Sequence, residues 1–164
     1  MSASLPKRPF REAYLLAYSE EHVFYEFDMF LWSARVCGSV AQLSAPSPAD
    51  AIPMSSALTE NFVVHLRNVI EFLYPKKPRR TDVTAADFCD SGVWQPTISE
   101  TLNAARNRAD KELAHLTTGR IPGSPRNKKW DCSGLSAELR PVMCCFVKNA
   151  LGSRLSPKVA AVIG

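Results

Sequence analysis

The 164-residue sequence lacks the long hydrophobic runs of a membrane protein and the cysteine pattern of a secreted one. Its unbroken apolar stretches, such as residues 29–32, are far shorter than the roughly 20 residues that span a bilayer. Glu20 and Glu21 interrupt the N-terminal region, which therefore lacks the apolar core of a signal peptide. The five cysteines include no CxxC pair, which argues against a disulfide framework or a zinc site. We therefore expect a cytoplasmic protein without a membrane partner.

Several familiar catalytic motifs are also missing. The sequence has no glycine-rich phosphate loop, which argues against ATP or GTP hydrolysis, and no serine in a nucleophile elbow. Its three histidines, His22, His65 and His115, include no pair spaced four residues apart. They therefore predict no metal site, and we expect no cofactor.

The composition that remains is that of an ordinary globular protein, with 46% hydrophobic and 22% charged residues. A chain of this length suits one domain with a single core. We expect that domain to cover residues 1–152 and residues 153–164 to form a loosely ordered tail.

Apolar residues recur at helical spacing in four segments, and no segment reads as a strand. The predicted helices cover residues 8–40, 57–74, 96–118 and 136–150, with a short helical turn capped by Thr84 between the second and the third. Pro141 is tolerable only in a first turn, which favours a later start for the last helix. The expected fold is all-α, an up-and-down bundle of four main helices with a short extra turn.

The first predicted helix has a long apolar stripe that includes Leu16, Val23, Phe27 and Phe30. Glu20 falls on this stripe. A boundary carboxylate that reaches solvent explains it better than a buried functional group does. The second predicted helix has an inward face made of Phe62, Leu66, Val69, Ile70 and Leu73.

Positive charge is concentrated in loops, although the net charge is only +4. Lys76, Lys77, Arg79 and Arg80 form one patch, and residues 120–129 contain another. Lysine and arginine gain free energy when they displace counterions from a polyanion. The patches favour a phosphate-bearing partner, and ordinary solubilising surface is the alternative.

The third predicted helix has the residues best suited to chemistry. Arg108 and His115 are seven residues apart, so on a helix they differ by about 20° around the axis. Lys111 and Glu112 lie between them, and the row falls at the rim of a bundle face. Such a row can bind a phosphodiester and move a proton. An exposed helix flank with spaced ion pairs is the structural alternative.

This pattern resembles the HEPN superfamily, helical bundles whose ribonuclease members have an arginine, four to six residues and then a histidine. Arg108 and His115 are separated by six residues, and Arg106 and Asn107 precede them as in a HEPN motif helix. The resemblance covers about residues 56–130. It includes residues 66–74, 82–88 and 105–117.

The resemblance implies a metal-independent endoribonuclease of the toxin or phage-defence type. His115 would act as general acid or base, Arg108 would hold the phosphate, and Lys111 would add positive charge. One histidine does not easily serve as both acid and base, so a homodimer with facing motif helices is expected. The supporting residues would be Glu112, Arg106 and Asn107, and the basic loop of Lys76, Lys77, Arg79 and Arg80 would bind RNA.

Other functions stay open. Arg108 is followed by Ala109, where active members usually have a polar residue. A non-catalytic HEPN-like bundle that binds a partner protein or nucleic acid is therefore the alternative, and a helical protein of unrelated function is a third. An antitoxin or the product of a neighbouring gene is the protein partner that the first hypothesis implies.

Overall fold

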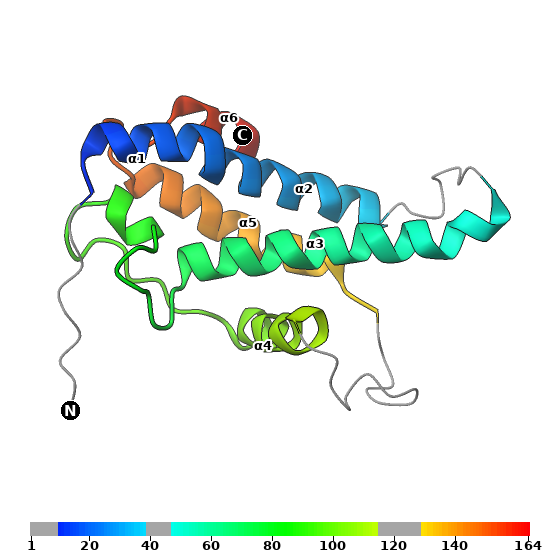
Figure 1. The fold of residues 1–164 in the computed structure, drawn as a ribbon. Coiled ribbons are helices and arrows are strands. Elements are labelled where there is room, and N and C mark those ends of the chain that lie inside the picture. Colours follow the sequence, from blue (N-terminus) through cyan, green and yellow to red (C-terminus); the bar gives the residue numbers. More distant parts are fainter. Residues whose placement is uncertain (1–9, 39–46, 115–128) are drawn as a thin grey trace.

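A computed structural model of the chain describes residues 10–38, 47–114 and 129–164, which form helices and their connections without a strand (Figure 1). The all-α prediction is confirmed. Across these ranges, no helix combines the length and the apolar character needed to cross a membrane. The elements in chain order are α1 (Glu12–Tyr18), η1 (Ser19–Val23), α2 (Phe24–Gly38), η3 (Pro48–Asp50), α3 (Ala51–Leu73), η4 (Ala85–Phe88), α4 (Glu100–Ala114), α5 (Cys132–Asn149) and α6 (Pro157–Ile163).

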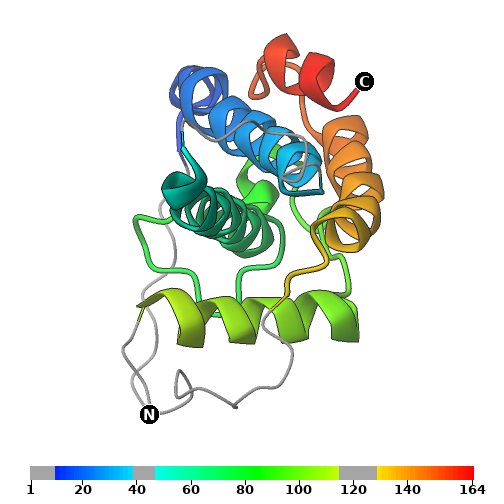
Figure 2. The same ribbon diagram turned by 90° about the vertical axis from the view of Figure 1, so that its right-hand side faces the viewer.

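The helices differ from a simple up-and-down arrangement. Helices α1 and α2 continue through η1 as one rod, and α3 and α5 run antiparallel to it (Figure 1). Helix α4 does not join this set but crosses it, in contact with α3 and α5 (Figure 2). Because α4 crosses the other helices, the loop that follows α3 lies beside α4.

A π-helical turn, η1, interrupts the first rod and changes which residues face the core. Leu15, before this turn, and Ser19, its first residue, are buried, whereas Leu16 is 36% exposed and Glu20 forms an ion pair with Lys158. The wider turn rotates the residues on its N-terminal side relative to an α-helix of constant period. The predicted inward position of Leu16 was therefore wrong, and the boundary role of Glu20 is confirmed.

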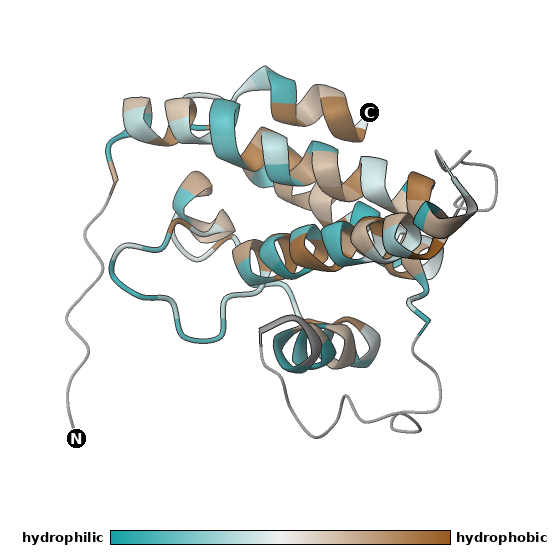
Figure 3. Ribbon diagram, turned by 45° about the vertical axis from the view of Figure 1, so that its right-hand side comes forward, coloured by the Kyte–Doolittle hydropathy of each residue, from teal (hydrophilic) through white to brown (hydrophobic). Residues whose placement is uncertain are grey.

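The core lies where α2, α3 and α5 meet. The predicted inward face of α3 is confirmed, since all of its members are buried, and Phe27 and Phe30 of α2 pack against the same core. Apolar residues are concentrated on the helices, while the loop between α3 and η4 is hydrophilic (Figure 3). The members of the α3 face are Phe62, Leu66, Val69, Ile70 and Leu73.

Helix α5 begins earlier than the sequence predicts. Asp131 caps it by accepting a hydrogen bond from the backbone N–H of Gly134, and Pro141 lies inside the helix rather than in its first turn. Proline has no N–H to donate to the preceding turn, so the helix proceeds with one hydrogen bond fewer. The prediction of a later start was wrong because packing and the Asp131 cap outweigh that loss.

The C-terminal residues are part of the packed structure. Helix α6 buries Val159 and Ile163, and the backbone N–H of Ser156 donates to Oγ of Ser19 at 2.8 Å. Arg140 of α5 donates to the carbonyl oxygen of Ile163 at 2.6 Å. Residues 153–164 therefore differ from the expected loosely ordered tail, because two apolar side chains four residues apart anchor them to the core.

The predicted helical turn after Thr84 is confirmed as η4, and it leads to a stability prediction. The backbone N–H of Thr84 donates to Oδ2 of Asp87 at 2.7 Å. We expect Asp87→Ala to lower the free energy of unfolding by roughly 1 kcal/mol, as the loss of a capping interaction does. Urea denaturation followed by circular dichroism measures it. Asp90→Ala, at an exposed site two residues beyond the turn, is the control, and equal effects of the two substitutions would contradict the prediction.

Candidate functional site

Two of the predicted rim residues of α4, Arg108 and Lys111, have described side chains. Ala105 and Ala109 face the core, Arg108 is half-buried and Lys111 is exposed. We call residues 106–111 of α4 the motif segment. His115 lies outside the described residues, as does the side chain of Glu112, so the predicted pairing of Arg108 with His115 stays a prediction.

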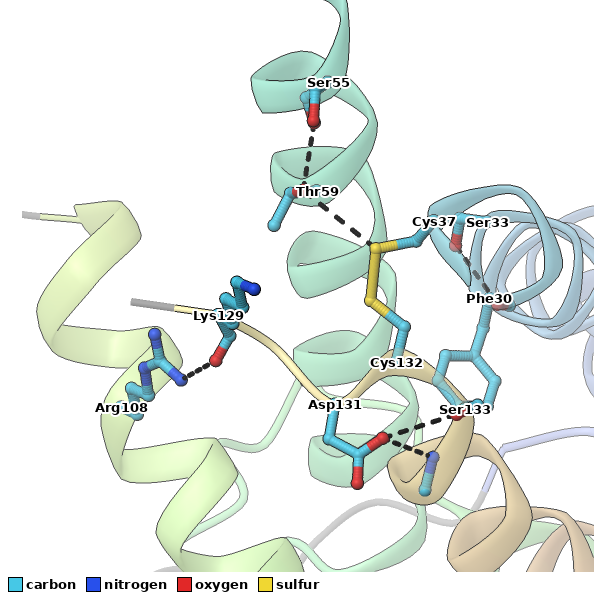
Figure 4. Close-up of a disulfide and its surroundings, with 11 residues drawn as sticks. Phe30, Ser33, Cys37, Ser55, Thr59, Arg108, Lys129, Asp131, Cys132 and Ser133 are labelled. Atoms are coloured by element: carbon cyan, nitrogen blue, oxygen red, sulfur yellow. Dashed lines mark hydrogen bonds between the residues drawn. A yellow bond between two sulfur atoms is a disulfide. The ribbon is translucent and has the colours of Figure 1, made fainter. Parts of the chain in front are cut away.

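Arg108 is held against the chain segment that enters α5. Its Nη1 donates to the carbonyl oxygen of Lys129 at 2.9 Å (Figure 4). Its guanidinium lies 4.1 Å from the centre of the Trp130 ring. A cation at this distance from an indole face is attracted by the quadrupole of the ring. The side chain is therefore oriented by a carbonyl and an aromatic ring.

Arg106 has a structural position. The residue is only 3% exposed, and its guanidinium donates to the carbonyl oxygen of Tyr74 at 3.0 Å and to Oδ1 of Asn103 at 2.7 Å. Tyr74 follows the last residue of α3, where helix carbonyls have no partner within the helix. Arg106 therefore fastens α4 to the end of α3.

The basic loop of residues 76–80 lies beside the motif segment. Nζ of Lys76 donates to Oδ1 of Asn107 at 3.0 Å, and Lys77, Arg79 and Arg80 are exposed. A second link comes from α3, where Nε of Arg67 contacts Oδ1 of Asp110 at 2.5 Å. The structure thus brings a predicted phosphate-binding residue of the loop, Lys76, to a predicted supporting residue of the helix, Asn107, although 31 residues separate them.

His65 is a buried, satisfied side chain. Its Nδ1 lies 2.8 Å from Oε2 of Glu26 on α2, and the residue is 5% exposed. Asn68 donates to the other oxygen of the same carboxylate at 3.2 Å. The sequence does not indicate this pair, because Glu26 belongs to another helix.

The cysteines do not all follow the sequence expectation. Cys37 and Cys132, 95 residues apart, form a disulfide between the end of α2 and the start of α5, with their Cα atoms 6.4 Å apart (Figure 4). The prediction against disulfides was wrong because pairing depends on proximity in the fold, which sequence spacing does not show. Burial raises the pKa of the Cys89 thiol to about 11, so this thiol stays neutral at physiological pH and is a poor nucleophile. The described ranges hold no cluster of three or more potential metal-binding side chains.

The chain matches no family model, no curated protein and no solved structure. The resemblance to the HEPN superfamily stays a prediction.

Proposed function

We propose that this chain is a HEPN-like endoribonuclease that cuts RNA as a homodimer without a metal ion. The observation that carries the proposal is the hydrogen bond from Lys76 to Asn107, which brings the basic loop to the motif segment. Exposed cations of the loop, together with Lys111, give this region the positive charge that attracts an RNA backbone. The proposal assigns phosphate binding to this region and catalysis to Arg108 of the same segment together with His115.

In the proposed reaction, His115 of one protomer takes the proton from an RNA 2′-hydroxyl. The 2′-oxygen attacks the adjacent phosphorus, and the bond to the 5′-oxygen breaks. His115 of the second copy gives its proton to that leaving oxygen, so the products are a 2′,3′-cyclic phosphate and a 5′-hydroxyl. Arg108 donates hydrogen bonds to the phosphate oxygens as negative charge builds, and Lys111 adds electrostatic stabilisation.

An enzyme that cuts host RNA requires control, so we place it among toxin or phage-defence proteins with an antitoxin or a neighbouring-gene product as its partner. The activity is tested on labelled single-stranded RNA in the presence of EDTA. We expect cleavage with cyclic-phosphate ends, and we expect His115→Ala and Arg108→Ala each to lower the rate by about 100-fold or more. Arg35→Ala, at an exposed site on α2, is the control for loss of one positive charge.

The outcome also tests a second function. The contacts of Arg108 with Lys129 and Trp130 are those of a residue that supports structure, which favours a bundle that binds nucleic acid without cutting it. RNA that stays intact while it binds the protein selects this alternative. A monomer in light scattering, together with intact RNA, would overturn the proposed nuclease.

A further inference from the structure

A cavity of about 430 Å³ is lined in part by the loop that follows α3. Its walls come from α1 and η1, from the second half of α3, and from the loop of residues 75–84. The volume is within the range of roughly 300–1,000 Å³ that small-molecule sites occupy. Its lining combines aromatic rings with charged and amide side chains, so it suits a flat ligand with polar edges.

One wall is a ladder of rings. Tyr14, Tyr18 and His22 are spaced four residues apart, with ring centres separated by 6.0 Å and then 4.7 Å. Tyr14 is 49% exposed, so part of the ladder is open to a ligand. The last of these rings is on the π-helical turn, a distortion that recurs at functional sites. Aromatic faces of this kind are platforms on which nucleobases stack.

The cavity also has groups that recognise the edges of a base. Asn68 and Glu71 of α3 and Glu26 of α2 line the cavity. A carboxylate accepts hydrogen bonds from the amino groups of bases, and an amide both donates and accepts. Burial, with the neighbouring Tyr14 and Glu26, raises the pKa of the Tyr18 hydroxyl, which therefore remains a neutral donor at physiological pH.

Positive charge stands beside these groups. Arg67 and Lys77 both line the cavity, and either is suited to a phosphate. Arg67 also contacts Asp110, and Lys77 follows Lys76, which bonds to Asn107. The cavity and the motif segment are thus joined at two points by adjacent residues.

We propose that this cavity binds one nucleobase, stacked on Tyr14, Tyr18 and His22, with the attached phosphate at Arg67 and Lys77. The inference rests on the proposed RNA-cutting function, since it makes the cavity the place where a base of the single-stranded substrate is held beside the motif segment. The same chemistry is offered by a free mononucleotide, and the experiment separates the two sources.

The test is calorimetric titration of the full chain with nucleoside 5′-monophosphates, with a single-stranded RNA hexamer, and with inorganic phosphate alone. We expect the nucleotides and the hexamer to bind and to compete with each other, and inorganic phosphate to bind at least tenfold more weakly. The double variant Tyr14→Leu with His22→Leu should weaken nucleotide binding by about tenfold or more, because stacking is lost. Trp32→Leu, an exposed aromatic on α2, is the matched control.

Equal affinity of the double variant and the wild type for nucleotides would overturn the proposal, as would equal binding of inorganic phosphate. Nucleotide binding without competition by the hexamer would overturn RNA as the source and support a free nucleotide. The outcome is separable from that of the catalytic proposal. If the Tyr14 and His22 variant still cuts RNA, only the cavity proposal fails. If the chain binds nucleotides but does not cut RNA, only the nuclease proposal fails.

Discussion

Replacement of Phe146 by alanine is expected to lower the free energy of unfolding by about 3–5 kcal/mol. Phe146 of α5 is fully buried. Its ring meets those of four other residues at centre-to-centre distances of 5.2–6.1 Å, each in an edge-to-face arrangement. Such pairs add to the free energy gained from burial alone. The four partners are Phe27, Phe72, Phe88 and Trp94, which come from four different parts of the chain.

Truncation of this ring leaves a void that the four surrounding segments cannot all close at once. Both the lost free energy of burying the ring and the cost of the remaining cavity are therefore expected to be large. Urea denaturation, followed by far-ultraviolet circular dichroism, gives the change in free energy. Phe146→Leu, which keeps most of the volume, should cost much less than Phe146→Ala. Trp32→Ala serves as the surface control, at 39% exposure. A Phe146→Ala protein as stable as the Trp32→Ala protein would show that the aromatic core is not centred on this residue.

Replacement of Arg106 by leucine is expected to lower the free energy of unfolding by about 2–4 kcal/mol. The substitution removes two hydrogen bonds made by a buried charged group and leaves the carbonyl of Tyr74 without its donor. Nε of Arg106 also lies 3.8 Å from the carboxylate of Glu71, an electrostatic contact that is lost as well. Removal of a buried cation also removes part of the free-energy cost of its desolvation. The expected loss of stability is therefore smaller than the summed free energies of the lost contacts.

Thermal and urea denaturation measure this effect, with Arg35→Leu as the control on an exposed site of α2. A second readout separates the structural role from a catalytic one. Below its melting temperature, the Arg106→Leu protein should still cut RNA if the wild type does, because Arg106 contacts α3 and not the surface. Unchanged stability with lost cleavage would reverse the assignment and return Arg106 to the catalytic surface.

The sequence predicts the helices best where one face is apolar without interruption. The inward face of α3 is correct at every position because its apolar residues recur every three or four positions from Phe62 to Leu73. Thr84 was also identified correctly, since a capping residue acts over a few neighbouring positions. The first rod was harder to predict, because a π-helical turn changes the period and its contact with α6 is not visible in the sequence. That is why Leu15, and not Leu16, faces the core.

The candidate site could be predicted only in part, because its residues come from distant parts of the chain. The cluster of cations after α3 is visible in the sequence, but its contact with Asn107 depends on how α4 crosses the bundle. The sequence does not show which of Arg106 and Arg108 has a structural role. The burial of Arg106 in the fold distinguishes it from Arg108. The partnership of His65 with Glu26 spans 39 residues and leaves no local signal.

The bond between Cys37 and Cys132 has a topological consequence. It closes a covalent ring that contains α3, η4 and α4, while α1 and α2 leave the ring on one side and α5 and α6 on the other. When such a chain unfolds without reduction, it becomes a closed circle with two tails and not a linear coil. A circle occupies less space than the open chain, so the oxidised protein should migrate ahead of the reduced protein in a denaturing gel.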